Sequence, residues 1–422
     1  MLKTLLINSM FCENKKDCRL CSSNNLSNAF SLKPTPLANE FVKDFNKHQD
    51  EYPLEINICD NCGHVQLGHV VNSDLLFTNY LYASGTSDVF VHHFNVYAEY
   101  IKDILNSSKE PPIAVDIGSN DGTLLNEFKK IGFDVIGVEP AQNLAEISKN
   151  NSIDVINGYF NQEAVGDIIS NKGKADIITA NNVFAHIDDL QGVIKDAYSL
   201  LSDEGLLVFE VSYLGSVIDG LLFDTIYHEH LDYHSVLPLI SFLKENGFKV
   251  IDILLVESHG GSIRVTSSKL QSLHKTRESV REFVKREQKH PITKATLNSL
   301  YNRIQQEKNK IVNYLKTLKQ EGKRIVAYGA PAKLTTLFYE FNIDSELVDF
   351  VIDDSPLKQG LYTPGSHIPI LAADSVNFND IDVIFIAAWN FAPSIIEKIK
   401  GQLRKEAIFI VPLPKFEIIA NE

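Results

Sequence analysis

The chain has 422 residues and a formal net charge of −14, with 44% apolar and 22% charged residues. This composition is that of a globular protein, and the length suggests about three domains. No apolar run approaches the ~20 residues needed to cross a bilayer, and no Lys/Arg stripe offers a nucleic-acid surface. The N-terminal segment lacks a small-residue cleavage site, so we expect a cytoplasmic protein without a signal peptide. The sequence does not set the oligomeric state, and a monomer is compatible with it.

Four of the five cysteines form two Cys-x-x-Cys pairs, Cys18 with Cys21 and Cys59 with Cys62. Two such pairs in one short region are the ligand pattern of a tetrahedral zinc site. A thioredoxin-like redox pair is the alternative, and the presence of two matched pairs disfavours it. Because a four-thiolate site has no open coordination position, we expect a structural Zn²⁺ that staples residues 1–75 into a module too small to fold on its own core.

Residues 76–270 are predicted to contain a doubly wound α/β sheet. A loop and a helix rich in aromatic residues come first, and short apolar runs then alternate with helical stretches. Such alternation is typical of a parallel sheet that binds ligands at the carboxyl ends of its strands. The expected strands are 113–117, 135–138, 154–156, 177–179 and 206–211, with helices to residue 130, over 187–201 and over 237–246, and a final strand pair, 249–256 and 262–267, around a Gly-Gly turn.

Residues 271–422 begin with a highly charged stretch, 272–320, whose spacing predicts one or two connecting helices. A second α/β unit follows, with strands expected at 324–328, 347–352 and 382–387. The turn Gly329–Lys333 after the first of these strands is too short for a phosphate-binding Gly-x-x-x-x-Gly-Lys loop, which argues against nucleotide hydrolysis. We expect a C-terminal Rossmann-like α/β domain.

A glycine-rich turn, residues 116–123 with the sequence Asp-Ile-Gly-Ser-Asn-Asp-Gly-Thr, follows the first strand of the central region. Glycines let the backbone approach a ligand, but the dinucleotide pattern Gly-x-Gly-x-x-Gly is absent. The acidic residues favour a ligand that is positive or neutral there and lacks phosphate. Glu139 ends the next strand, where a carboxylate can accept both hydroxyls of a ribose. An adenosine that carries a sulfonium fits both features.

This turn resembles the first motif of the class I methyltransferases that use S-adenosylmethionine. The resemblance implies a cofactor site formed by Asp116, Gly118, Ser119, Asn120, Gly122, Thr123, Glu139 and Asn181.

Residues 223–234 hold three histidines and three carboxylates within twelve positions. Histidine can take or give a proton near neutral pH, and a neighbouring carboxylate can orient its ring. A metal site that uses His228 and His230 is an alternative, although the His-Glu-x-x-His pattern is absent. His228 and His234 are expected to be structural.

The order of these features resembles the sugar C-methyltransferases, over residues 18 to about 416. The most specific marks are Asn182–His186, Tyr227–His230 and the segment 358–369; the His-Gly-Gly-Ser-x-Arg turn at 259–264 and the Gly-Ala-Pro-Ala-Lys turn at 329–333 also fit. These enzymes add a branching methyl to a nucleotide-linked 4-keto-deoxysugar. The resemblance implies methylation at C-3, with C-5 as the variant within the family.

The resemblance also implies roles for individual residues. His230 is expected to remove a proton next to the ketone, supported by Glu229, Tyr227 and His186. Tyr80 or Tyr82 would complete the active site. The substrate-binding residues would be Lys333 and Lys358, facing the diphosphate unless they are solvated lysines, and Arg264.

Two other functions remain open from the sequence. One keeps S-adenosylmethionine but methylates an oxygen or nitrogen, which requires no ketone. The other is a zinc-stapled binding protein without catalysis, against which the complete turn 116–123 and Glu139 argue.

Overall fold

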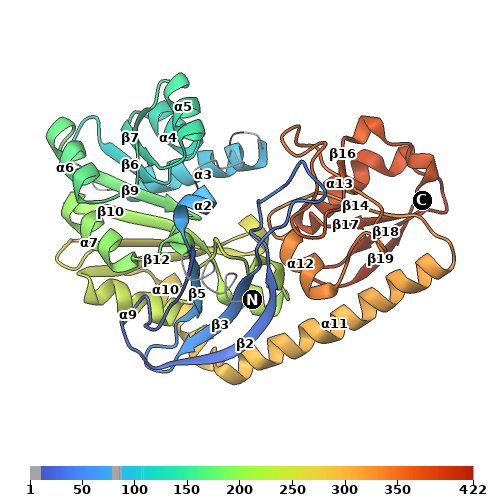
Figure 1. Cartoon of the computed structure of the whole chain (residues 1–422). Coiled ribbons are helices and arrows are strands. Elements are labelled where there is room, and N and C mark those ends of the chain that lie inside the picture. Colours follow the sequence, from blue (N-terminus) through green and yellow to red (C-terminus); the bar gives the residue numbers. More distant parts are fainter. Residues whose placement is uncertain (1–10, 78–84, 86–87, 106, 108, 422) are drawn as a thin grey trace.

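The computed structural model describes residues 11–77, 85, 88–105, 107 and 109–421, which are arranged around several sheets (Figure 1). The N-terminal region forms a four-stranded antiparallel sheet with the order β11-β4-β3-β2 and a small pair, β1-β5. Strand β11 comes from the centre of the chain, so this sheet is not built from the N-terminal region alone. The strands are β1 Cys12–Asn14, β2 Leu26–Thr35, β3 Tyr52–Cys59, β4 Val65–Leu67, β5 His69–Val71 and β11 Asp232–Tyr233.

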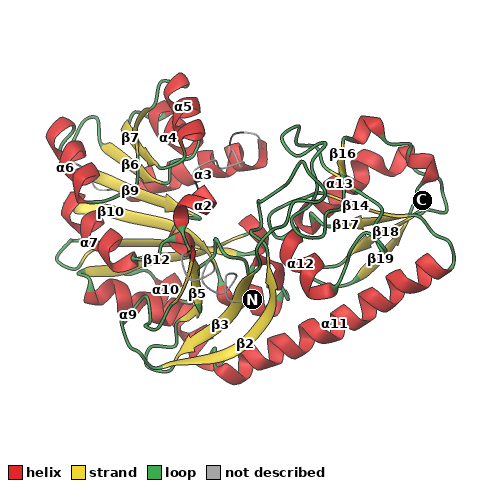
Figure 2. Cartoon of the chain, viewed as in Figure 1, coloured by secondary structure: helices red, strands yellow, loops and turns green. Residues whose placement is uncertain are grey.

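The central region forms a seven-stranded sheet with helices on both faces (Figure 2). Its order is β12-β13-β10-β9-β6-β7-β8, and β13 runs antiparallel to both neighbours while the other pairs are parallel. All residues of β6 are buried, as expected for a central parallel strand. The strands are β6 Ile113–Ile117, β7 Asp134–Glu139, β8 Asp154–Asn157, β9 Ala175–Asn181, β10 Leu201–Ser212, β12 Phe248–Val256 and β13 Ser262–Lys269.

This sheet confirms the predicted doubly wound α/β architecture. The helix expected over 187–201 begins only at Leu190, because the side chain of Asp189 accepts a hydrogen bond from the Gly192 amide and caps it there. The helices of this region are α2 Ser73–Phe77, α3 Asp88–Ile104, α4 Thr123–Lys130, α5 Gln142–Asn150, α6 Gln162–Asn171, α7 Leu190–Leu200, α8 Leu214–Asp219 and α9 Val236–Glu245, with the short 3₁₀ turns η2 Phe184–His186, η3 Phe223–Thr225 and η4 Ser258–Gly260.

The C-terminal region has a six-stranded sheet, β16-β15-β14-β17-β18-β19, in which β19 alone is antiparallel to its neighbour. The strand expected at 347–352 is reduced to β15, because the amides of Leu347 and Val348 both turn back to the Asp344 carbonyl. The strands are β14 Ile325–Tyr328, β15 Val351–Ile352, β16 Ile370–Leu371, β17 Val383–Ile386, β18 Ile408–Val411 and β19 Glu417–Ala420. The helices are α12 Leu334–Phe341 and α13 Ala392–Ile399, with the 3₁₀ turns η5 Ala373–Ser375, η6 Phe378–Asp380, η7 Trp389–Phe391 and η8 Lys400–Gln402.

The charged stretch expected to connect the two α/β regions forms two helices, α10 Glu278–Lys289 and α11 Lys294–Gln320. Helix α11 runs along the lower side of the molecule toward the C-terminal sheet (Figure 1). Its buried residues include Leu297, Leu300 and Ile304, at the spacing of one helix face. None of the described helices is long and apolar enough to cross a membrane.

The N-terminal sheet lies between the two α/β regions. Strand β2 packs against both α11 and α12, and Figure 1 shows β2 and β3 placed between the green and the red parts of the chain. One hydrophobic core includes Leu54 of β3, Ile226 near η3, Leu300 of α11 and Phe341 of α12. The predicted divisions 1–75, 76–270 and 271–422 stay predictions, and this shared core joins all three.

Candidate active site

The glycine-rich turn follows β6 at the carboxyl edge of the central sheet. Gly118, Asn120 and Gly122 have φ angles of 65°, 53° and 79°, which favour glycine or asparagine. A Cβ on Gly118 would lie 2.6 Å from Cγ2 of Val183, which follows β9. The turn is therefore closely packed against the neighbouring strand end, and its backbone can border a ligand.

Glu139 is held at the end of β7 by two backbone amides. Oε2 accepts from the Asn120 amide and Oε1 from the Ala141 amide, each at 2.8 Å. Burial raises the pKa of Glu139. Each carboxylate oxygen keeps a further lone pair, so the side chain is preorganised to accept two hydroxyl groups.

The remaining predicted cofactor residues lie around the same edge. Asp116 is buried beside Thr179, whose hydroxyl donates to it at 2.6 Å, and burial raises the pKa of Asp116 to about 7. The Thr123 hydroxyl donates to Asp121 at 2.5 Å. Both polar atoms of the Asn181 carboxamide are buried. Burial raises the pKa of Tyr97, and a hydrogen bond from Asn181 opposes that shift, so the carboxamide has a neighbour within the protein and its cofactor role stays a prediction.

The His230 ring is fixed by two hydrogen bonds. Nδ1 lies 2.7 Å from the carbonyl oxygen of Thr225, to which it can only donate, so Nε2 carries the lone pair. The Tyr227 hydroxyl lies 3.0 Å from Nε2 and therefore donates to it. Burial lowers the pKa of His230 to about 4, and the Lys333 ammonium acts in the same direction. The imidazole is therefore neutral at physiological pH, yet part of its surface remains accessible.

Of the other predicted catalytic residues, His186 and Tyr227 contact this ring. The rings of His186 and His230 meet edge to face, with centroids 4.9 Å apart. Glu229 accepts a hydrogen bond from the Asn39 amide of the N-terminal region at 2.7 Å. Burial, followed by the charge of Glu229, raises the pKa of Tyr227 well above its ordinary value, so its hydroxyl keeps its proton. Tyr80 and Tyr82 lie outside the described residues.

The other two histidines of the segment 223–234 face away from this group. His228 Nε2 lies 3.1 Å from the Tyr52 carbonyl, and His234 packs on the ring of His64. Among the described residues, only the four cysteines form a group that could hold a metal ion. The metal-site alternative for His228 and His230 therefore gains no support from this geometry.

The three predicted substrate residues have different surroundings. Lys333 follows the β14 turn, lies 3.9 Å above the ring of Trp389 and is placed close enough to Asp224 and His230 to shift their pKa values. Lys358 donates to the Ala330 carbonyl at 2.8 Å.

Arg264 is buried in β13 and paired with Glu210 of β10, with Nη2 2.6 Å from Oε1. Of the three predicted substrate residues, the structure thus brings only Lys333 close to His230. For Lys358 and Arg264, substrate binding stays a prediction that these internal contacts do not favour.

The four cysteines meet at one point. The Sγ atoms of Cys18 and Cys62, and those of Cys21 and Cys59, are 3.6 Å apart, and all four lie within 4.8 Å of one another. Tetrahedral zinc with Zn–S bonds of about 2.3 Å requires sulfurs about 3.8 Å apart. The donor set and its spacing therefore fit zinc.

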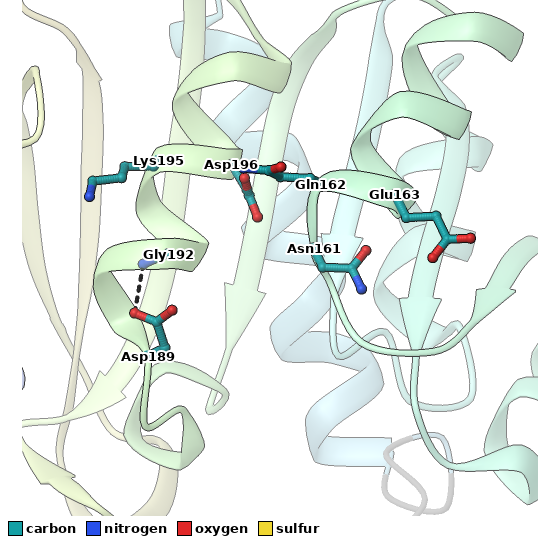
Figure 3. Close-up of a pocket in the computed structure, with 7 residues that line it drawn as sticks. All are labelled: Asn161, Gln162, Glu163, Asp189, Gly192, Lys195 and Asp196. Atoms are coloured by element: carbon teal, nitrogen blue, oxygen red, sulfur yellow. Dashed lines mark hydrogen bonds between the residues drawn. The ribbon is translucent and has the colours of Figure 1, made fainter.

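A separate groove of about 450 Å³ lies between the first turns of α6 and α7 (Figure 3). Asn161 and Asp189 cap these helices, so their side-chain oxygens are already engaged by backbone amides. None of the predicted site residues lines this groove, and its carboxylates make it unsuited to an anionic ligand. Its lining residues are Asn161, Gln162, Glu163, Asp189, Gly192, Lys195 and Asp196.

Comparisons with known proteins agree with this arrangement. Three family models match: a zinc binding domain over residues 18–77, a methyltransferase domain over 90–253 and a C-methyltransferase C-terminal domain over 257–414. The C-methyltransferase NovU of Streptomyces niveus is 30% identical over 96% of this chain and 97% of its own length. The chain belongs to the NovU family of C-methyltransferases. It is thus an S-adenosylmethionine-dependent enzyme with a zinc-binding N-terminal region.

Other matches cover less than half of this chain. A ubiquinone biosynthesis O-methyltransferase of Colwellia psychrerythraea is 25% identical over 33% of this chain and 61% of its own length. The magnesium protoporphyrin IX methyltransferase of Synechocystis covers 42% of this chain and 83% of its own, with 13% identity and a TM-score of 0.33.

Three residues that support the site were not anticipated. The Thr225 carbonyl orients His230, Asn39 binds Glu229, and Asp224 accepts from the Trp389 indole at 2.6 Å. The first is a backbone group, and the other two are contacts between distant parts of the sequence, so no local pattern signals them.

We predict that Glu139→Gln weakens S-adenosylmethionine binding by tenfold or more. In the glutamine side chain, the NH₂ group would face a backbone N–H, and one oxygen that could accept a ribose hydroxyl would be lost. A hydrogen bond to a charged group contributes about 1.5–3 kcal/mol. Titration calorimetry measures the affinity. Glu146→Gln, on the exposed side of α5, is the matched control. Unchanged affinity in Glu139→Gln would exclude Glu139 as a cofactor ligand.

We also predict that the chain binds about one zinc ion and loses thermal stability when a chelator removes it, because a four-thiolate site contributes folding energy. Elemental analysis and scanning calorimetry give the two readouts. Cys59→Ser should lose the metal, whereas Cys12→Ser, at the cysteine outside the cluster, should keep it. Full zinc content in Cys59→Ser would contradict the assignment.

Proposed function

We propose that this C-methyltransferase transfers the methyl group to a ring carbon, C-3 in the first instance, next to the C-4 ketone of a nucleotide-linked deoxysugar. The observation that carries the proposal is the neutral His230, whose Nδ1–H is bound to Thr225 and whose Nε2 is free of a proton. Carbon methylation needs a base of this kind, whereas transfer to an amine or phenol does not depend on removing a C–H proton.

The chemistry follows from the acidity of a C–H bond next to a ketone. The Tyr227 hydroxyl would first turn from Nε2 toward the ketone oxygen and so free the lone pair of Nε2. Nε2 of His230 then takes the proton, and the electron pair of the C–H bond moves into an enolate whose charge rests on oxygen. When bound, S-adenosylmethionine supplies an electrophilic methyl group. The enolate carbon would take up this methyl group while the electrons of the S–CH₃ bond stay on sulfur, and His230 would then return its proton to solvent.

Tyr227 is suited to stabilise the enolate oxygen. Its raised pKa keeps the hydroxyl protonated, and this hydroxyl already lies at the nitrogen that must accept the substrate proton. A donor aimed at a developing oxyanion in a site with little water is a large contribution to catalysis. His186 meets the ring edge to face, and Glu229 precedes His230 in the chain and is held by Asn39, in keeping with the roles that the family resemblance implies.

Lys333 is the proposed contact for the anionic part of the substrate. Its stem lies in a largely buried position, with the ammonium over Trp389, and burial lowers its pKa while Asp224 opposes the shift. A cation beside the base, at the first turn of the C-terminal α/β region, can meet a diphosphate. The substrate would then lie between the central and C-terminal sheets.

A panel of nucleotide-linked 4-keto-deoxysugars, with matched analogues reduced at C-4, tests the reaction. We expect one added methyl on carbon for at least one ketosugar and none for its reduced analogue, measured by mass spectrometry and carbon NMR. Methylation of the reduced analogue on oxygen would replace the proposal with O-transfer. Cofactor binding without turnover of any ketosugar would remove the ketosugar assignment.

The pKa of His230 predicts the pH dependence of proton removal. A base with a pKa of about 4 is active above that pH and loses activity as the pH falls through it, rather than near 6.5. NMR of α-proton exchange into deuterated solvent measures this, at ketosugar concentrations far below KM, where the rate reports the pKa of the free enzyme. His230→Asn should abolish exchange, and His48→Asn, at an exposed histidine, should not.

Folding must be monitored in the same experiment. Burial also lowers the pKa values of His228 and His234 to about 4, so the protein loses stability as the pH falls from 6.5 toward 4. Near-UV circular dichroism at each pH separates unfolding from titration. An acid limb near 6.5 in folded enzyme, or full exchange in His230→Asn, would contradict His230 as the base.

A further inference from the structure

Arg19 lies inside the first zinc knuckle, between Cys18 and Cys21, and its side chain is fully buried. Burying a guanidinium is costly unless it is paired and hydrogen-bonded. The knuckle needs only its two cysteines to hold a metal. The structure must therefore use this buried charge for something other than metal binding.

The Arg19 guanidinium contacts both segments that carry the proposed catalytic histidines. Nε lies 2.9 Å from Oδ1 of Asp188, two residues after His186. Nη1 donates to the carbonyl of Leu231, the residue after His230, at 3.3 Å and to the carbonyl of Leu67 at 3.0 Å. One planar group thus links two segments that are far apart in the sequence.

The same two segments also touch each other. The Leu231 amide donates to the Ala185 carbonyl at 2.6 Å, and the rings of His186 and His230 meet edge to face. Because an arginine fork holds its donors in fixed directions, it can set the separation of two partners, which a flexible lysine cannot. The position of Arg19 therefore affects how the rings of His186 and His230 are placed relative to each other.

Arg19 is itself fixed by the zinc-binding region. Its backbone amide donates to the Gln66 side chain at 2.9 Å, and Gln66 lies in β4, opposite Asp232 of β11. A second link starts at the other knuckle, where His64 Nε2 lies 2.5 Å from Asp232 Oδ1. A residue in or next to each cysteine pair therefore contacts the segment 223–234.

We propose that Arg19 is a positioning residue, through which the zinc-binding module sets the geometry between His186 and His230. The inference rests on the proposed function only for the roles of these two histidines. The hydrogen bonds of Arg19 to described residues reach Gln66, Leu67, Asp188 and Leu231, outside the cofactor turn, so it acts through Asp188 and the Leu231 carbonyl.

The main experiment compares Arg19→Lys with the wild type. Lysine keeps the charge but cannot span Asp188 and Leu231 together. We expect kcat to fall roughly 10- to 100-fold, as small misplacements of reacting groups do, with KM for the ketosugar and the affinity for S-adenosylmethionine within about twofold. Zinc content should remain that of the wild type.

A readout independent of turnover is the ¹⁵N spectrum of the imidazole rings in histidine-labelled enzyme, assigned with His186→Asn and His230→Asn. The signals of these two rings should move in Arg19→Lys. If no substrate is ever methylated but the signals move, the positioning role stands and only the proposed function fails. Unmoved signals with unchanged kcat would overturn the inference.

Lys15→Met is the matched control. Lys15 is the other cation on Asp188, at 3.3 Å, whereas the described hydrogen bonds of Leu231 go to Arg19, Leu67 and Ala185. We expect wild-type kcat and unmoved histidine signals. An effect equal to that of Arg19→Lys would show that the charge on Asp188 matters rather than the link, and would overturn the proposal.

Asp188→Asn tests the link from its other end, because asparagine removes the charge but keeps an oxygen that can accept from Arg19 Nε, at a side chain that is 42% exposed. This variant replaces Arg19→Lys in the main experiment if Arg19→Lys does not fold. The double variant with Arg19→Lys should be no slower than the worse single variant, because both changes break one connection. If the kcat losses of the two single variants multiply in the double variant, Arg19 and Asp188 do not act through one connection.

Discussion

The pairing of β11 with β4 is the constraint on which the active site depends. Between η3 and β11 the chain has no helix or strand of its own, so its backbone must find partners elsewhere. The Leu67 amide binds the Leu231 carbonyl, and Asp232 and Tyr233 extend the N-terminal sheet. The segment that carries His230 is thus held by a sheet in which β3 ends at the zinc ligand Cys59 and β4 begins three residues after Cys62. A metal distant from the chemistry can in this way determine the rigidity of the site.

The shared core explains why the zinc-binding region lies between two α/β regions instead of at the end of the molecule. Strand β2 packs on α11 and α12, and Asn39, beyond that strand, reaches Glu229. A small sheet of this kind would bury too little apolar surface alone. Packed on both sides, it fixes the distance between the cofactor edge of the central sheet and the Lys333 turn of the C-terminal sheet.

The sequence was most informative where one residue type at a fixed spacing decides the structure. The paired cysteines, the turn 116–123 and Glu139 are local patterns, and the structure brings each set together. Arg264 shows where prediction from local sequence patterns fails. Its partner Glu210 is directly opposite in the β10–β13 register, and this could have been inferred only with the strand order in hand. Arg19 and Asn39 act on residues 212 and 190 positions away, so no periodicity could have predicted them.

Electrostatics around His230 connect the proposed substrate to the proposed chemistry. In the free enzyme, burial and the Lys333 ammonium both favour the neutral imidazole, which is available as a base but a weak one. A diphosphate bound to Lys333 would offset that positive charge and remove one of the two causes of the lowered pKa. The base would then become stronger as the ketosugar arrives. The proposed anion-binding lysine, Lys333, beside the proposed base would thus couple substrate binding to proton removal, whereas a lysine at the Lys358 position, bound to the Ala330 carbonyl, would not have this effect.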